Sequence, residues 1–79
     1  MADVENINGY NVGFSYLRFY QQHPEIGLPT DEQHGDVGGY QTFENAQLSW
    51  TGEKVQVYWK GSGPAPEWMG GETVKEFEV

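Results

Sequence analysis

The spacing of apolar residues divides the chain into a helical part and a β-forming part. Between residues 12 and 20 apolar side chains recur at helical spacing, with Tyr16 and Tyr20 four positions apart and Leu17 beside both. One face of this segment is therefore apolar and rich in aromatic rings. The pattern predicts an amphipathic helix that packs on a second element.

Local signals bound this helix on both sides. Asn11 is a residue type that caps helix N-termini, and Pro24 cannot continue a helix. Gly13 weakens the first turn, so we expect regular helix from about Phe14. His23 then lies in the last turn, where a cationic group suits the negative end of the helix dipole.

After residue 39 the pattern changes to a period of two, which is typical of half-buried strands. Two turns separate the alternating segments, at residues 44–45 and 51–53. Within the last two segments every second residue is apolar, so each has one apolar face. The expected strands are 40–43, 46–50 and 54–60. Ala46, Leu48 and Trp50 share one face of the second strand. Val55, Val57 and Trp59 share one face of the third strand, with Gln56 and Tyr58 on its opposite face, so the meander has one apolar face.

These elements predict an α+β fold in which one N-terminal helix packs on a three-stranded antiparallel β-meander. Residues 1–10 are polar and read as a flexible arm, residues 11–60 form the helix-plus-meander module, and residues 61–66 are a Gly/Pro linker. The tail at 67–79 fits a helical turn or a strand, so an extra C-terminal strand or an arm both remain open.

A short apolar corner joins the helix to the β-forming part. It consists of Ile26, Gly27, Leu28, Pro29 and Thr30. Gly27 can take a positive φ, and Pro29 pushes Leu28 toward an extended conformation. Ile26 and Leu28 are the apolar residues expected to pin the corner to the core. We interpret the segment as a structural corner.

The order of these parts resembles the LGFP repeat. The matching residues are 14–22 for the aromatic helix, Gly27-Leu28-Pro29-Thr30-Asp31-Glu32 for the corner, Gly38-Gly39-Tyr40-Gln41-Thr42-Phe43 for the first strand and Gln47-Leu48-Ser49-Trp50 for the next. The resemblance covers roughly residues 13–60, and the spacing between the motifs is kept. It implies a single, divergent copy of a module found mostly as tandem repeats in bacterial envelope and secreted proteins. Such modules are thought to attach their host protein to the cell wall, and they are not enzymes.

Composition narrows the function classes. The net charge is −8, from twelve acidic residues against four lysines and arginines. Too few cations are present to neutralise phosphates, so we expect no nucleic acid partner and no anionic membrane partner. No apolar run approaches the roughly eighteen residues of a membrane span, so no membrane insertion is expected. Cysteine is absent, which excludes disulfides and thiolate metal sites.

The N-terminus lacks the basic and apolar regions of a signal peptide. The resemblance implies an extracellular or envelope location, whereas Met1 as a native start without a removed signal implies the cytoplasm.

No sequence motif indicates a catalytic site. Ser15 and Ser49 lack a nucleophile-elbow context, and His23 and His34 are separated by the corner. We therefore expect no enzyme activity and no cofactor. Asp31, Glu32 and Asp36 are candidate calcium ligands, because hard oxygen ligands on a Gly-rich loop suit that ion, although their spacing matches no EF-hand. Solvated charge is the alternative for these three.

Aromatic residues are the better candidates for binding, because twelve rings exceed what a core this small can hide. Trp and Tyr rings bind the apolar faces of sugars and anchor protein interfaces. The candidates are Trp50, Tyr58, Trp59 and Trp68. By alternation Trp50 and Trp59 face the core, which leaves Tyr58 and Trp68 as the exposed pair.

The sequence thus predicts a non-catalytic binding module for a bacterial envelope glycan or an envelope protein. Two alternatives stay open. The chain fits a small acidic bacterial or phage protein that binds and inhibits or caps a basic partner surface, since opposite charges steer such encounters. It also fits an accessory subunit of a larger assembly, in which the arm and tail supply contacts.

Overall fold

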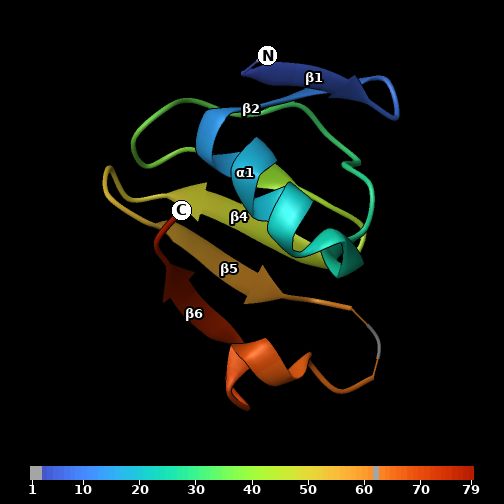
Figure 1. Ribbon diagram of the computed structural model, residues 1–79, viewed down its shortest axis with the longest axis vertical. Coiled ribbons are helices and arrows are strands. Elements are labelled where there is room, and N and C mark those ends of the chain that lie inside the picture. The colour runs from blue at the N-terminus through green and yellow to red at the C-terminus, as the bar shows by residue number, and fades with distance from the viewer. Residues whose placement is uncertain (1–2, 62) are drawn as a thin grey trace.

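A computed structural model describes residues 3–61 and 63–79 of the chain. Within them the fold is α+β, with one α-helix, a two-stranded sheet and a four-stranded antiparallel sheet. The elements in chain order are β1 Val4–Ile7, β2 Tyr10–Gly13, α1 Phe14–Gln22, the 3₁₀-helix η1 Pro24–Ile26, β3 Tyr40–Thr42, β4 Ala46–Trp50, β5 Val55–Trp59, the 3₁₀-helix η2 Glu67–Met69 and β6 Val74–Phe77. Figure 1 shows α1 between the β1–β2 hairpin and the larger sheet.

The N-terminal segment is ordered, which corrects the expected flexible arm. Strands β1 and β2 pair antiparallel from Val4↔Gly13 to Ile7↔Tyr10. The turn between them is Asn8-Gly9, with φ of 54° and 87° at the two residues. Two positive φ values in a two-residue loop are typical of a type I′ hairpin turn, for which Asn-Gly is the preferred dipeptide. Residues 1 and 2 of the expected arm lie outside the described residues.

The hairpin also displaces the predicted helix start. Asn11 lies in β2 and does not cap α1; Gly13 occupies the N-cap position, with an extended backbone and no side-chain cap. The expectation of regular helix from Phe14 is confirmed, and so is the end before Pro24. The helix N-terminus is held by the strand pairing that precedes it instead of by a capping side chain.

The predicted meander is confirmed in outline, and the tail adds a strand to it. The strand order is β3-β4-β5-β6, with every neighbouring pair antiparallel. Strand β6 pairs with β5 from Val55↔Phe77 to Tyr58↔Val74. The chain after the Gly/Pro segment therefore completes the sheet, and it is not a free arm.

The core lies between α1 and the apolar face of the sheet. It includes Tyr16, Leu17 and Phe19 from the helix, and Leu48, Val55 and Val57 from the strands, all nearly or fully inaccessible to solvent. Met69 from η2 is completely buried in the same cluster. Because the tail supplies a core residue as well as a strand, residues 67–79 belong to the same folding unit as the helix and meander.

The corner at residues 26–30 packs against the turn between β3 and β4. Ile26 and Pro29 are fully buried, whereas Leu28 is 40% exposed and does not pin the corner to the core as expected. Gly27 has φ 87° and ends the 3₁₀-helix η1. Backbone hydrogen bonds join Glu44 N to Leu28 O at 3.0 Å and Asn45 N to Ile26 O at 2.9 Å. The corner is thus a docking point for the hairpin turn.

The two edges of the larger sheet differ. The outer side of β3 carries short bridges from the chain before it, Pro29↔Phe43 and His34↔Tyr40. At the other edge lies β6, where Val74 and Glu76 are exposed and alternate with the partly buried Lys75 and Phe77. Among the described residues no strand pairs with the outer side of β6.

Candidate functional site

The four aromatic residues singled out from the sequence lie in three different environments. Tyr58 is 46% exposed on the outer face of β5, away from the core. Trp59 and Trp68 contact one another, with ring centroids 6.2 Å apart. Trp50 is partly buried and lines a surface hollow. The structure therefore does not gather the four rings into one binding platform.

Trp68 belongs to an aromatic cluster beneath α1. Its ring centroid lies 4.4 Å from that of His23, 5.7 Å from Phe19 and 5.4 Å from Phe77. The carbonyl of Trp68 also accepts a hydrogen bond of 3.4 Å from Lys75 Nζ. These contacts attach the tail to the helix. Trp68, expected to be exposed, instead packs as a structural residue.

Trp59 lines a hollow of about 440 Å³ formed by glycine- and proline-containing segments on either side of η2. Its indole nitrogen is buried without a hydrogen-bond partner among the described residues. The other lining residues are Gly61, Gly63, Pro64, Ala65, Gly71, Glu72 and Thr73. Besides the single ring of Trp59, this hollow offers only Glu72 and Thr73 as polar side chains among its described lining residues.

Two adjoining hollows lie near the helix N-terminus. The first has a volume of about 350 Å³ and the second about 300 Å³. Both are lined by Gly13, Phe14 and Gln33, so they meet at these residues. We call the pair the Phe14 groove. The first hollow adds Val4, Asn6, Gly9, Tyr10, Asn11 and Glu32, and the second adds Ser15, Tyr16, Asp36 and Trp50.

Phe14 is the exposed aromatic residue that lines both hollows, and sequence reasoning missed it as a site residue. Its side chain is 59% exposed, and its backbone has φ 53°. A positive φ is a genuine outlier for a bulky residue and costs of order 1–3 kcal/mol. The backbone N–H of Phe14 donates a hydrogen bond of 2.7 Å to Asp3 O, which holds this conformation. An exposed aromatic ring is thus presented by a backbone that the surrounding structure constrains.

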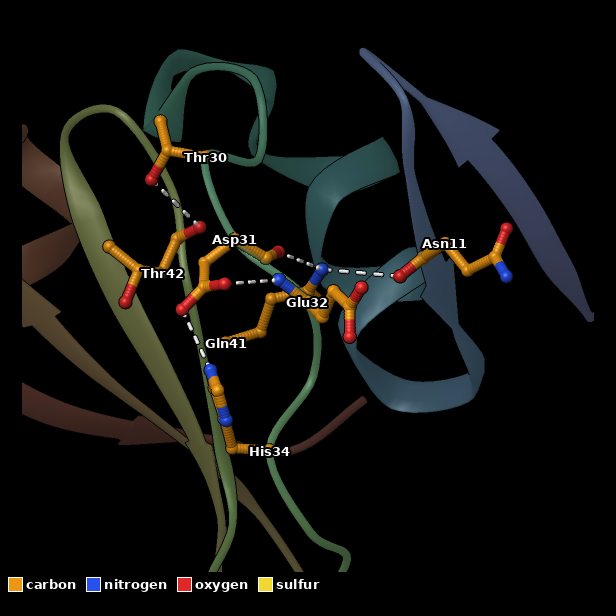
Figure 2. Close-up of polar contacts among 7 residues, drawn as sticks. All are labelled: Asn11, Thr30, Asp31, Glu32, His34, Gln41 and Thr42. Atoms are coloured by element: carbon orange, nitrogen blue, oxygen red, sulfur yellow. Dashed lines mark hydrogen bonds and ion pairs between the residues drawn. The ribbon is translucent and has the colours of Figure 1, made fainter.

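The buried side chain of Gln41 positions one wall of the groove. Figure 2 shows its amide group between β2 and the segment that carries Asp31. Its Nε2 donates hydrogen bonds of 3.2 Å to Asn11 O and 3.1 Å to Asp31 O. Since Gln41 is fully buried, these bonds form away from water, where an unmade bond is costly. They fix the chain on both sides of the first hollow, including the neighbouring Glu32.

The other wall is held by Tyr16. Its hydroxyl donates a hydrogen bond of 3.3 Å to Gly39 O, and Trp50 N donates to the same carbonyl at 3.2 Å. Burial, and secondarily the negative charge of Asp36, raise the pKa of Tyr16 to about 12. The loop that carries Asp36 is thus attached to both the helix and β4, which places its carboxylate beside the second hollow.

The three candidate calcium ligands are not brought together. Asp31 pairs with His34, whose Nε2 donates a hydrogen bond of 2.7 Å to Asp31 Oδ2, as Figure 2 shows. This bond, and then the one from the N–H of Glu32, hold the pKa of Asp31 below its ordinary value. Glu32 lines the first hollow, and Asp36 lines the second. In residues 3–61 and 63–79 no group of three or more His, Cys, Asp or Glu side chains is placed to hold a metal ion.

The two histidines occupy different sites. His23 packs in the aromatic cluster with Trp68 and lies 3.4 Å from Glu25 through Nδ1. His34 stacks on Tyr40, with ring centroids 4.7 Å apart, and bonds Asp31. The structure therefore gives each histidine its own partners and does not combine them into an acid–base pair.

Comparison with family models, with curated proteins and with solved structures found no match to this chain. Among the helices of the described chain, none has both the length and the apolar character needed to span a bilayer. The site therefore has to be interpreted from its own geometry.

Proposed function

We propose that this protein is a non-catalytic binding module and that the Phe14 groove is its ligand site. The observation that carries the proposal is Phe14, an exposed aromatic residue that lines both hollows and has a backbone φ of 53°. Strained conformations persist only where the surrounding structure holds them, and they concentrate at ligand sites. A large exposed aromatic residue offers a platform for stacking at little entropic cost.

The target that we propose is a polymer of the bacterial cell envelope. The resemblance of residues 13–60 to the LGFP repeat supports this choice of target, and the groove supplies a place for it. Of the residues expected to bind, Trp50 lines the second hollow. Tyr58 lies on the outer face of β5, and Trp59 and Trp68 contact one another. None of these three residues lines either hollow, so they are not part of the proposed site.

Sedimentation with purified cell-wall sacculi tests the proposal. The parent protein should sediment with the sacculi at moderate salt, because stacking and hydrogen bonds resist ionic screening. Phe14→Ala should reduce the bound fraction about tenfold or more. Tyr58→Ala removes another exposed ring, 46% accessible against 59% for Phe14, and should leave binding unchanged. Circular dichroism would verify that both variants are folded. Equal binding by the parent protein and Phe14→Ala would refute the site.

Phe14→Gly separates the strain from the binding. Glycine accepts a positive φ without the Cβ penalty, which is roughly 1–2 kcal/mol for other residues. We therefore expect Phe14→Gly to unfold at a higher temperature than Phe14→Ala while binding as weakly. A lower melting temperature for the glycine variant would show that φ at this position is not strained.

The net charge favours a second candidate, an acidic protein that docks on a basic partner surface. Such a complex would be steered by charge, so its association rate would fall steeply as salt is added. Pull-down from bacterial lysate at low and high ionic strength separates the two functions. Capture of one basic protein, lost at high salt, together with no binding to sacculi, would favour this candidate.

A further inference from the structure

Each hollow of the Phe14 groove contains one carboxylate. Glu32 lines the first hollow and Asp36 the second, and both side chains are exposed. None of the described lining residues of either hollow is Lys, Arg or His. Neither carboxylate group accepts a hydrogen bond or forms an ion pair with another described residue. The groove therefore presents two free acceptor groups and no lining cation.

Apart from Val4 and two glycines, the rest of the lining consists of aromatic, amide and hydroxyl side chains. Asn6 donates a weak hydrogen bond of 3.3 Å to Asn11 Oδ1, and Gln33 Nε2 donates to Gly35 O at 2.9 Å. Each of these amides keeps further donor or acceptor capacity. Arg18 reaches the rim of the second hollow, where it donates to Ser15 Oγ at 3.2 Å, and not to Asp36.

We infer that the groove binds an uncharged glycan chain, with consecutive sugar rings in the two hollows and Phe14 between them. This inference rests on the proposed function and specifies the ligand class. A sugar ring has an apolar face that stacks on an aromatic ring and an edge of hydroxyl groups. Glu32 and Asp36 accept hydrogen bonds from such hydroxyls, and bonds to an ionised acceptor are roughly twice as strong as neutral ones.

Anionic envelope polymers do not fit the same site. A phosphate or uronate group would approach an unpaired carboxylate in either hollow, and no lining cation would offset the repulsion. The net charge of −8 adds a repulsive field around the whole protein. The volumes of about 350 and 300 Å³ lie at the lower end of the range for small-ligand sites, which suits one ring in each hollow.

Isothermal titration with oligosaccharides of defined length tests the inference. The probes are uncharged oligomers of glucose and of N-acetylglucosamine with one to four units, and uronic-acid oligomers of the same lengths. Affinity for the uncharged series should rise about tenfold or more from one unit to two, because the second hollow is then filled. It should level off after two or three units. The uronic-acid series should bind at least about tenfold more weakly.

Isosteric variants locate the contacts. Glu32→Gln and Asp36→Asn keep the shape of each hollow and remove its charge, and each should weaken binding of the uncharged dimer about five- to tenfold. Glu53→Gln, an exposed carboxylate of the β4–β5 turn that lines neither hollow, is the matched control and should leave affinity unchanged. Unaltered affinity in both groove variants would overturn the inference.

The remaining outcomes separate the inference from the function on which it rests. Equal or tighter binding of uronic-acid oligomers would overturn the uncharged class. The uncharged class would also be overturned if cationic, de-N-acetylated glucosamine oligomers bound more than about tenfold tighter than N-acetylated ones and this difference disappeared in salt. If sacculi bind through Phe14 but no uncharged oligomer does, the inference fails and the proposed function stands. If neither binds, both fail.

Discussion

The backbone N–H of Leu28 donates a hydrogen bond of 2.8 Å to Oε1 of Glu44, sixteen positions further along the chain. The return bond, from Glu44 N to Leu28 O, is 3.0 Å long. The side chain of Glu44 therefore folds over the corner and occupies the space beside Gly27. A Cβ atom added to Gly27 would lie 2.7 Å from Cβ of Glu44. Glycine is required at position 27 both because its φ is positive and because the Glu44 side chain leaves no room for a Cβ atom.

Gly27→Ala is expected to lower the free energy of unfolding by about 2 kcal/mol or more, because it combines a positive φ with a steric overlap. Gly9→Ala is the comparison, since Gly9 shares the φ of 87° but lies in a hairpin turn and has no atom within 4 Å of its added Cβ, whereas Gly27 also has ψ −177°, a region nearly restricted to glycine. Gly9→Ala should cost only about 1 kcal/mol. Urea denaturation measures both. Equal losses would show that contact with Glu44 contributes nothing.

Trp68→Ala is expected to act on stability and not on ligand affinity. The ring contacts Phe19, His23 and Phe77, so its removal leaves a cavity between helix and tail. Truncation of a large aromatic residue in a core costs about 3–5 kcal/mol, and the loss should be somewhat smaller here because Trp68 is partly buried. Thermal unfolding gives the loss, and titration of the folded variant gives the affinity. A folded variant with normal stability and lost affinity would show that Trp68 takes part in ligand binding.

Gln41→Met tests whether a buried amide positions the groove. Methionine keeps the volume of the side chain but loses the hydrogen bonds to Asn11 O and Asp31 O. We expect a loss of about 2 kcal/mol in stability and a weaker ligand affinity, because the two walls of the first hollow are no longer joined. Gln47→Met on β4, whose side chain makes no hydrogen bond with another described residue, is the control. An equal effect of both changes would contradict the assignment.

The raised pKa of Tyr16 predicts that ionisation of this side chain contributes to unfolding at alkaline pH. Its pKa is raised from 10.0 to about 12, so the fold favours the neutral phenol. The stabilisation linked to this shift is fully present below pH 10 and is lost as the pH rises toward 12. Tyr16→Phe should unfold more easily at neutral pH, because it lacks the bond to Gly39 O, yet show a shallower decline of stability between these pH values. Parallel pH profiles for the two proteins would contradict the shift.

Much of the fold was predictable because local sequence patterns indicate its helix and strands. The alternation at residues 46–50 and 55–59 indicates strands with one buried face, and Pro24 marks where the helix must stop. The hairpin also has a local signal, the dipeptide Asn8-Gly9 directly before the alternating residues 10–13, although the polarity of residues 1–10 as a whole predicts an arm. An Asn-Gly dipeptide is a stronger signal for a hairpin turn than the polarity of the flanking segment is for an arm.

The site was less predictable, because it depends on contacts between distant segments. The sequence placed Trp50 among the candidates, but nothing local to Phe14 shows that its backbone takes a positive φ. That conformation follows from the pairing of β1 with β2 and from the bond to Asp3 O. Likewise, the two carboxylates Glu32 and Asp36 reach their separate hollows only through the anchoring of their loop by Gln41 and Tyr16.

Among the described residues no strand pairs with the outer edge of β6, so its charged side chains are what guards this edge against pairing with other chains. An open strand edge is a template for pairing with other chains, and natural proteins protect such edges with charged side chains. Here Lys75 and Glu76 occupy the middle of the strand, and Val74 beside them is exposed. Storage in high salt or at a pH that neutralises the carboxylates would weaken this protection. Purification near neutral pH at low ionic strength should therefore keep the protein monodisperse.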